Sequence, residues 1–296
     1  MEEVISVRTM RESDAHTIEN YVPSKELMYR AAMGVYRAVS WNRGAIGILT
    51  GAGNNGGDGY ALACILADNG FSCRVYRVSE KFSEDGKYYY DMAVSKGVET
   101  VPFSQDADLS HCDILVDCIL GTGFSGQVRG LPRAAIEAIN KQTGAYVVSV
   151  DINSGLNGDS GEAELAVKAD LTVTIGYLKT GFFLKDAAQY VQQLVVADIG
   201  IRLIREDYYL ASPEEIVFPQ SGLALAEAPK GILPPEEAEG LLREGQTIPE
   251  LVTELAREKK GLIRFSGETA LISDGYRTYF IAEGVLPKVI RSLGGE

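Results

Sequence analysis

The chain has 296 residues, of which 46% are apolar and 23% are charged, and its formal net charge is −13. This composition is typical of a globular protein, and the length allows one large domain with a small appendage. The acidic balance argues against nucleic acid or an anionic membrane as a partner, because both bind to basic surfaces.

The sequence shows no sign of membrane insertion or secretion. No apolar run reaches the roughly 18 to 20 residues of a membrane-spanning helix, and the opening MEEVISVRTMRES lacks the apolar core of a signal peptide. We therefore expect a cytoplasmic protein. The four cysteines have no zinc-ligand spacing, so we expect buried free thiols at the following positions: Cys64, Cys73, Cys112 and Cys118.

The first 42 residues predict two helices separated by a Val-Pro break. In the second helix, Leu27, Met28, Ala31 and Val35 recur at helical spacing, which predicts a face that packs on the core.

The next segment, from Ile46 to Tyr60, reads IGILTGAGNNGGDGY and predicts a strand, a glycine-rich turn and a helix. Glycines let a ligand approach main-chain N–H groups, and the first turn of the helix adds unpaired amides, so the turn suits phosphate. Its Asn and Asp oxygens also suit a hard cation. The turn lacks the Gly-Lys-Ser/Thr of a Walker A loop, and the next strand lacks the acidic residue of the usual dinucleotide fingerprint.

The later apolar segments lack polar alternation and are separated by helices, which predicts a parallel sheet covered on both faces. Unusual residues follow four of these strands. After the first strand comes the glycine turn, and after the others come Asp117 with a second glycine-rich loop, Asp151 with Ser154, and Lys179. Because ligands bind at the carboxyl ends of parallel strands, we expect one site there.

The residue types suggest roles within this site. Asn55, Asp117 and Ser154 are candidates for a cation site, and the absence of a dense carboxylate cluster favours a monovalent ion or none over Mg²⁺ or Ca²⁺. Asp151 is the candidate general base, with a turn cap as the alternative. Lys179 is a candidate to balance ligand charge, with an ordinary surface lysine as the alternative.

Four motifs, GAGNNGGDG, DCILGTGFSGQVRG, VDINSGLNGDSG and GYLKTG, resemble in order and spacing those of the NAD(P)H-hydrate epimerase family. The resemblance covers roughly residues 1 to 210. It implies a three-layer α/β/α Rossmann-like domain with a mostly parallel, doubly wound sheet, commonly homodimeric. It also implies repair of damaged nicotinamide cofactors, by interconversion of the R and S epimers of hydrated NADH and NADPH (NADHX and NADPHX), which carry a hydroxyl at nicotinamide C6.

The resemblance implies K⁺ at Asn55, Asp117 and Ser154, and a catalytic contact between Asp151 and the substrate. Together with Lys179, the residues matched to the family's substrate site give this predicted set: Asn54, Asn55, Gly56, Gly57, Asp58, Gly121, Thr122, Gly123, Phe124, Ser125, Gly126, Gln127, Asp151 and Lys179.

Two departures from the family pattern keep a second hypothesis open. Asn153 replaces a usual Pro, which we expect to loosen the turn that holds Asp151, and Gln127 replaces a common carboxylate. The alternative is a catalytically weakened nucleotide-binding or protein-interaction module of the same fold. A flavin or nicotinamide oxidoreductase is a third possibility.

We expect two domains, an epimerase-like domain over residues 1–211 and a small α/β extension over residues 212–296. The segment KKGLIRFSGETALISDGYRTYFIAEG resembles a strand-hairpin part of the ribokinase-like dehydratase that is fused to this domain in many bacteria. The extension lacks the Gly-x-Gly-Asp signature of that fold and is too short for it. We therefore interpret it as a degenerate remnant or an unrelated appendage, without dehydratase activity.

Overall fold

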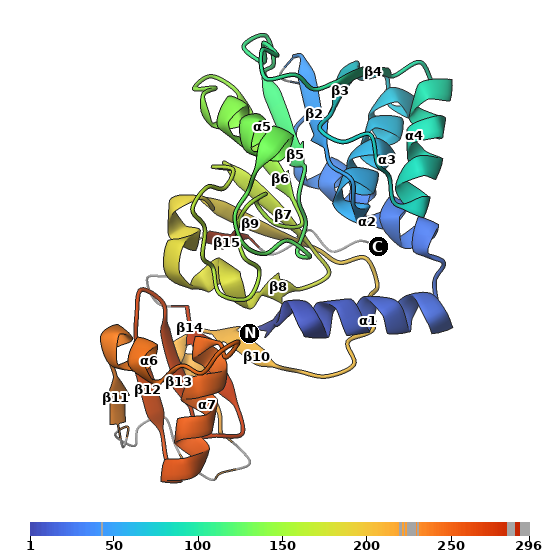
Figure 1. Cartoon of the computed structure of the whole chain (residues 1–296). Helices are drawn as coiled ribbons and strands as arrows, with labels where there is room; N and C mark the ends of the chain where they lie inside the picture. The colour runs from blue at the N-terminus through green and yellow to red at the C-terminus, as the bar shows by residue number, and fades with distance from the viewer. Residues whose placement is uncertain are drawn as a thin grey trace.

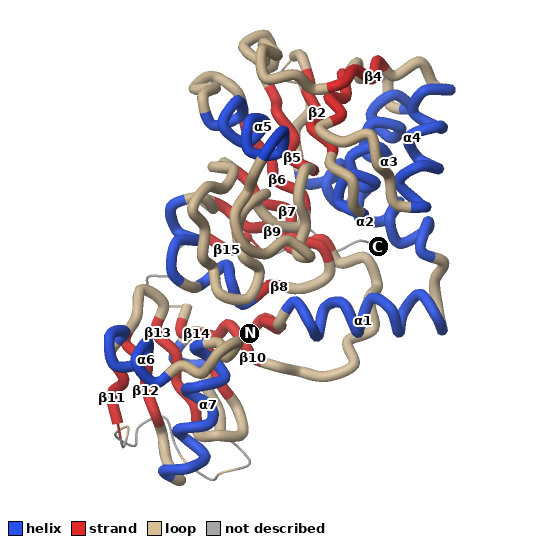
Figure 2. The backbone as a smooth tube through the Cα atoms, viewed as in Figure 1, coloured by secondary structure: helices blue, strands red, loops and turns tan. Residues whose placement is uncertain are grey.

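The computed structural model describes residues 1–42, 44–218, 221, 223, 229, 231–282 and 288–290. Within these residues the chain forms two β-sheets with helices around them (Figures 1 and 2). No helix in this described part is both long and apolar enough to cross a membrane.

The larger sheet has eight strands in the order β15-β9-β7-β6-β5-β2-β3-β4, and all of its pairs are parallel. Every residue of the three strands β2, β5 and β7 is buried, as the lack of polar alternation predicted. The bounds are β2 (Ile46–Thr50), β3 (Cys73–Arg77), β4 (Glu99–Pro102), β5 (Ile114–Cys118), β6 (Tyr146–Val150), β7 (Leu171–Ile175), β9 (Gln193–Ala197) and β15 (Lys288–Ile290).

Helices cover both faces of this sheet, as the α/β/α prediction requires (Figure 1). One face packs against α2 (Ser24–Ala38), α3 (Asn54–Asp68) and α4 (Glu84–Ser95), and the other against α5 (Gly130–Asn140). The predicted core face of α2 is buried. All four cysteines are buried and free, so that prediction is confirmed.

The smaller sheet has seven strands in the order β11-β12-β13-β14-β10-β1-β8 and mixes parallel with antiparallel pairs. The helices α6 (Pro235–Leu241) and α7 (Ile248–Lys259) belong to the same part of the chain. The bounds are β1 (Glu2–Ile5), β8 (Leu178–Lys179), β10 (Tyr208–Ala211), β11 (Gly231–Leu233), β12 (Ile263–Ser266), β13 (Ala270–Ser273) and β14 (Thr278–Ile281), with 3₁₀ turns η1 (Thr180–Phe183), η2 (Lys185–Gln189) and η3 (Pro213–Glu215).

The C-terminal extension is joined to the rest of the chain through both sheets. Strand β14 pairs with β10, and β15 adds to the edge of the larger sheet beside β9. The rings of Phe183 and Phe280 lie 5.4 Å apart in a shared apolar core. The domain boundary after residue 211 stays a prediction. It falls at the end of β10, whose partners lie on both sides of that boundary.

The first helix, α1 (Val7–Asn20), lies between the two sheets (Figure 1). The N–H of Val7 donates to Asp159 Oδ1 at 2.7 Å, and both the N–H and the hydroxyl of Ser6 donate to Asp207 Oδ2 at 2.9 Å. These bonds join the start of the helix to residues far along the chain. They hold the start of α1 in place, so that the helix lies over the carboxyl ends of the strands of the larger sheet.

Candidate active site

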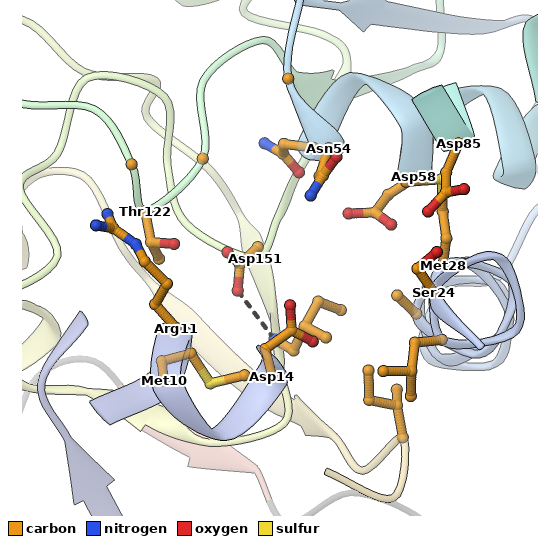
Figure 3. A pocket seen from close by; sticks show the side chains of 18 of the residues that line it. Met10, Arg11, Asp14, Ser24, Met28, Asn54, Asp58, Asp85, Thr122 and Asp151 are labelled. Atoms are coloured by element: carbon orange, nitrogen blue, oxygen red, sulfur yellow. Dashed lines mark hydrogen bonds between the residues drawn. The ribbon is translucent and has the colours of Figure 1, made fainter. Parts of the chain in front are cut away.

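A pocket of about 620 Å³ lies where the strands β2, β5, β6 and β7 end (Figure 3). The glycine turn, the second glycine-rich loop, α1 and α2 form its walls. Its lining residues are Met10, Arg11, Asp14, Ile18, Ser24, Leu27, Met28, Ala31, Ala52, Gly53, Asn54, Asn55, Asp58, Asp85, Ile119, Leu120, Gly121, Thr122, Gly123, Phe124, Asp151, Ile175, Ile199 and Ile201.

The glycine turn brings the start of α3 to the pocket. The helix begins after Gly53 with no side-chain cap, and a Cβ built on Gly53 would meet nothing within 4 Å. A ligand therefore has room to approach the chain at Gly53, next to the first amides of α3, as an anion site requires. Asn54, Asn55 and Asp58 line the pocket.

Two predicted substrate residues of this turn are packed instead of lining the pocket. A Cβ on Gly56 would lie 2.2 Å from the carbonyl oxygen of Gly51, and one on Gly57 would lie 2.5 Å from Met28 Cε. Both glycines are buried, so their small size permits close packing of the turn and α2.

In the second glycine-rich loop, too, only some of the predicted residues line the pocket. Gly121, Thr122, Gly123 and Phe124 line the pocket, whereas the three residues that follow, Ser125, Gly126 and Gln127, are exposed and outside its lining. The Gln127 side chain accepts a hydrogen bond from Arg129 at 3.1 Å. The structure thus places the replaced carboxylate position away from the pocket.

Asp151 follows β6 with a positive φ of 66°, a conformation that Asp and Asn adopt more readily than other non-glycine residues. Its N–H donates to the carbonyl of Val173, which fixes the residue to β7. The carboxylate accepts from Lys179 Nζ at 2.6 Å and from the N–H of Ile175 at 3.3 Å. Its side chain keeps 18% exposure, toward the pocket.

Lys179 is fully buried behind Asp151 and does not line the pocket itself. Its ammonium also donates to Thr174 Oγ1 and to the carbonyl of Ile175, each at 2.8 Å. The surface-lysine alternative is therefore wrong. The turn-cap alternative for Asp151 is also wrong, because its carboxylate accepts hydrogen bonds from Lys179 and Ile175 among the described residues. The ion pair holds one carboxylate oxygen of Asp151 in place.

The three predicted cation ligands meet around the backbone of Leu120. Asn55 Nδ2 donates to the Leu120 carbonyl at 2.9 Å, and the Leu120 N–H donates to Ser154 Oγ at 2.8 Å. Ser154 Oγ donates to Asp117 Oδ1 at 2.5 Å. Asn55 Oδ1 is buried and has no hydrogen-bond partner among the described residues. Such an orphaned oxygen beside two further oxygen side chains fits a monovalent cation.

Asp117 lies beneath this cluster and is fully buried. It accepts bonds from the N–H groups of Ser154 (2.8 Å) and Ile119 (3.2 Å) and from the hydroxyls of Ser149 (2.9 Å) and Ser154. Burial raises the pKa of Asp117, and these bonds oppose the rise.

Asn153, which we expected to loosen the turn, does not do so. Its side chain is fully buried, donates to the carbonyls of Val167 (2.9 Å) and Tyr190 (3.0 Å), and accepts from Thr172 at 2.7 Å. The amide thus ties the turn after β6 to neighbouring segments, which a Pro side chain cannot do.

The first helix, α1, provides a part of the pocket that was not predicted from the sequence. Met10, Arg11 and Asp14 line it from this helix, and Asp85 lines it from α4 (Figure 3). Among the lining residues, all of which belong to the described part of the chain, Arg11 is the only Lys or Arg. The motif MRESD could have indicated this contribution to the pocket, because its Arg and Asp are three residues apart and so lie on one face of the helix.

Two pocket carboxyls are electrostatically unlike Asp151. Burial raises the pKa of Asp14, and it raises the pKa of Asp58 well above its usual value. The nearby charge of Asp151 adds to both shifts, and the positive charge of Lys179 opposes them. Within the described residues, neither carboxyl has a hydrogen-bond donor that would favour its charged form.

Residues 24–181 match the family described as "YjeF-related protein N-terminus". The NAD(P)H-hydrate epimerase of Lentilactobacillus buchneri is 33% identical over 207 residues, which are 68% of this chain and 96% of that protein. The epimerase of Oenococcus oeni is 36% identical over 205 residues, covering 67% of this chain and 96% of that protein.

A longer relative and a solved structure also match this chain. The bifunctional NAD(P)H-hydrate repair enzyme Nnr of Coxiella burnetii is 34% identical over 66% of this chain, and the match spans only 41% of that protein. The crystal structure of the yeast protein YNL200c has a TM-score of 0.57 and 22% identity, over 69% of this chain and 91% of that one, and shows the shared fold. This chain belongs to the YjeF-related family, whose members include the NAD(P)H-hydrate epimerases.

Proposed function

We propose that this chain is an NAD(P)H-hydrate epimerase that interconverts the R and S epimers of hydrated NADH and NADPH. Relatives that bear this name match almost along their whole length. The observation that carries the proposal is the Asp151–Lys179 ion pair, which presents one carboxylate to a pocket flanked by two glycine-rich loops. Such a carboxylate suits proton transfer at the C6 hydroxyl.

We assign different roles to different residues of the pocket. The main-chain amides at the start of α3 and in the loop from Gly121 to Phe124 bind the pyrophosphate, and Arg11 adds the one cationic side chain of the lining. This places the hydrated nicotinamide near Asp151. Lys179 holds the Asp151 carboxylate in one orientation through a buried contact.

A bound K⁺ is part of the proposal. Asn55, Asp117 and Ser154 would hold it, and the orphaned Asn55 Oδ1 supports this assignment. When bound, the ion would supply positive charge beside the pyrophosphate. Among the described residues no group of three or more His, Cys, Asp or Glu side chains is arranged to hold a metal, which favours a monovalent ion over Mg²⁺.

The two other functions are less well supported. Asn153 and Gln127 were the reasons to consider a weakened binding module, yet Asn153 is firmly hydrogen-bonded and Gln127 lies outside the pocket. The names of the relatives favour the epimerase over an oxidoreductase. A homodimer and a cytoplasmic location stay part of the proposal.

The direct experiment starts from one purified epimer of NADHX or NADPHX in potassium buffer. Addition of the purified chain should accelerate the approach to the epimer equilibrium, followed by chromatography. An exchange rate equal to the uncatalysed background would refute the proposal. Comparison of the two substrates then gives the preference between NADHX and NADPHX.

Asp151→Asn is the matched variant for this experiment. Asn tolerates the positive φ of this position, whereas Ala would add about 1–2 kcal/mol of backbone strain. Because an amide is not a base, we expect the rate to fall by about 10²–10⁴-fold with the fold retained. A variant that keeps the rate of the parent would remove Asp151 from the mechanism.

A further inference from the structure

Four carboxyl groups from four different elements face this pocket. Asp14 comes from α1, Asp58 from α3, Asp85 from α4, and Asp151 follows β6 (Figure 3). One ammonium, that of Lys179, lies next to them and contacts Asp151 directly. Among the described residues, one of the four carboxyl groups is therefore in an ion pair and the other three are not.

The two environments favour opposite protonation states. Asp151 accepts a charge-assisted bond and a main-chain bond, both of which stabilise a carboxylate. Asp14 is partly buried, accepts no hydrogen bond within the described chain, and lies beside the negative charge of Asp151. Both effects raise the pKa of Asp14 and favour its neutral, proton-donating form. Unequal carboxyls in one pocket are typical of an acid and a base.

We propose that Asp14 is the second catalytic residue of the epimerisation and exchanges a proton with the C6 hydroxyl while Asp151 serves the opposite face of the ring. This proposal rests on the proposed epimerase function. Figure 3 shows Asp14 beside Asp151, at the end of the pocket away from Asn54. A pyrophosphate bound by the start of α3 would direct the nicotinamide toward these two carboxyls.

The chemical steps balance without an oxidant or reductant. Asp14 gives its proton to the C6 hydroxyl, the C6–O bond breaks, and water leaves with the bonding electrons while the N1 lone pair forms an N1=C6 double bond. Water then adds to the other face of C6, its extra proton passes to Asp151, and the double-bond electrons return to N1. The net result is inversion at C6 and transfer of one proton from Asp14 to Asp151, which solvent returns.

Asp14 is held in place for this role by contacts that do not involve its carboxyl. The start of α1 is bonded to Asp159 and Asp207, and Met10 packs in the core one turn earlier. The charged groups that face Asp14 are Arg11 on its own helix, Asp58 on α3, Asp85 on α4, Asp151 after β6 and Lys179 of β8. A substitution of the carboxyl should therefore change the chemistry with little effect on the fold.

The test compares the parent chain with Asp14→Asn, starting from a single epimer. We expect kcat to fall by about 100-fold and KM to change by less than about threefold, since the amide keeps the shape but donates no acidic proton. The parent rate should decline as pH rises and Asp14 loses its proton. The variant should lack that part of the decline.

Asp14→Ala and Glu19→Gln complete the design. Asp14→Ala leaves space for a small carboxylate, so added formate should restore part of the rate, an effect that a purely structural role would not give. Glu19 is exposed on the same helix, and Glu19→Gln should keep the parent rate. If Asp14→Asn retains its rate within threefold, or formate restores nothing, Asp14 is not catalytic. An inactive parent chain would instead refute the epimerase function itself.

Discussion

Asp117 and Asp58 are both carboxyl groups near the ends of the same parallel strands, yet their surroundings differ. Asp117 accepts four hydrogen bonds from Ile119, Ser149 and Ser154, whereas Asp58 accepts none from the described residues. Burial raises the pKa of both, and it raises that of Asp58 well above the usual range because no donor opposes it.

This difference separates the floor of the site from its wall. We define the floor as Asp117 with its donors, and the wall as Asp14, Asp58 and the Asp151–Lys179 pair. The satisfied carboxyl of the floor stabilises three chain segments that meet below the pocket. The unsatisfied carboxyls of the wall cost stability and remain available for a ligand. Substitutions in the two regions should therefore have opposite effects.

Asp117→Ala tests the floor and should have the largest effect on stability. It leaves the N–H groups of Ile119 and Ser154 buried without a partner, which costs about 1–3 kcal/mol each. We expect a loss of about 4 kcal/mol in the free energy of unfolding, measured by urea denaturation. Asp106→Ala, at an exposed position, serves as the control. A loss below about 1 kcal/mol would show that the network contributes little.

Lys179→Met tests the wall by removing the buried cation that the wall contains. Lys179 orients the Asp151 carboxylate, and its charge lowers the pKa of Asp14 and Asp58. Its removal should reduce epimerisation by about 100-fold, since misplacement of a reacting group by about 1 Å has such an effect. It should also shift the alkaline decline of the rate to higher pH, because the acids then keep their protons longer.

The control for this variant is Lys168→Met, which changes the same charge at an exposed site. We expect it to retain the pH–rate profile of the parent chain. If Lys179→Met keeps that profile too, the buried ammonium does not govern the carboxyls of the wall.

Local patterns were enough to predict the helices, the parallel sheet and the grouping of the three candidate cation ligands. Apolar runs without alternation gave the buried strands, and the rule for strand ends brought Asn55, Asp117 and Ser154 together around Leu120. Each of these features depends on residues close to one strand and on the geometry common to parallel sheets.

The parts that local patterns could not predict depend on contacts between distant residues. Asp14 lines the pocket because α1 is bonded to Asp159 and Asp207, more than 150 positions away in sequence. The pairing of β10 with β14 likewise joins the extension to the first strand of the chain. Asn153 was misjudged because its hydrogen-bond partners, among them Val167 and Tyr190, cannot be identified before the fold is known.

A third test concerns the Asn55 oxygen at the edge of the floor. If K⁺ binds there, potassium should raise the melting temperature of the parent chain over that in choline buffer. At ten times the dissociation constant the stabilisation is about 1.4 kcal/mol, or about 3–6 °C. Asn55→Ala should lose this response because it removes the unpartnered oxygen. Equal melting temperatures of the parent in both buffers would leave the oxygen without a cation.

The smallest expected effect, about 1 kcal/mol, belongs to Asp58→Asn in the wall. At a pH below the ordinary Asp pKa, Asp58 is protonated in both the folded and unfolded chains, so the variant and the parent should be similarly stable. As pH rises, the unfolded chain releases this proton while the folded chain retains it, because burial raises the pKa of Asp58 in the fold. The parent therefore loses stability toward neutral pH.

Asn lacks this titration, so the melting temperature of Asp58→Asn should exceed that of the parent at pH 7.5, by about 2–4 °C for 1 kcal/mol, and the gap should close toward pH 4. Asp14 titrates in both proteins, so most of its effect cancels. A gap that does not change with pH would mean that Asp58 ionises freely in the fold. The wall would then resemble the floor, where hydrogen bonds offset part of the cost of burying the carboxyl charge, and the contrast between the two regions would be wrong.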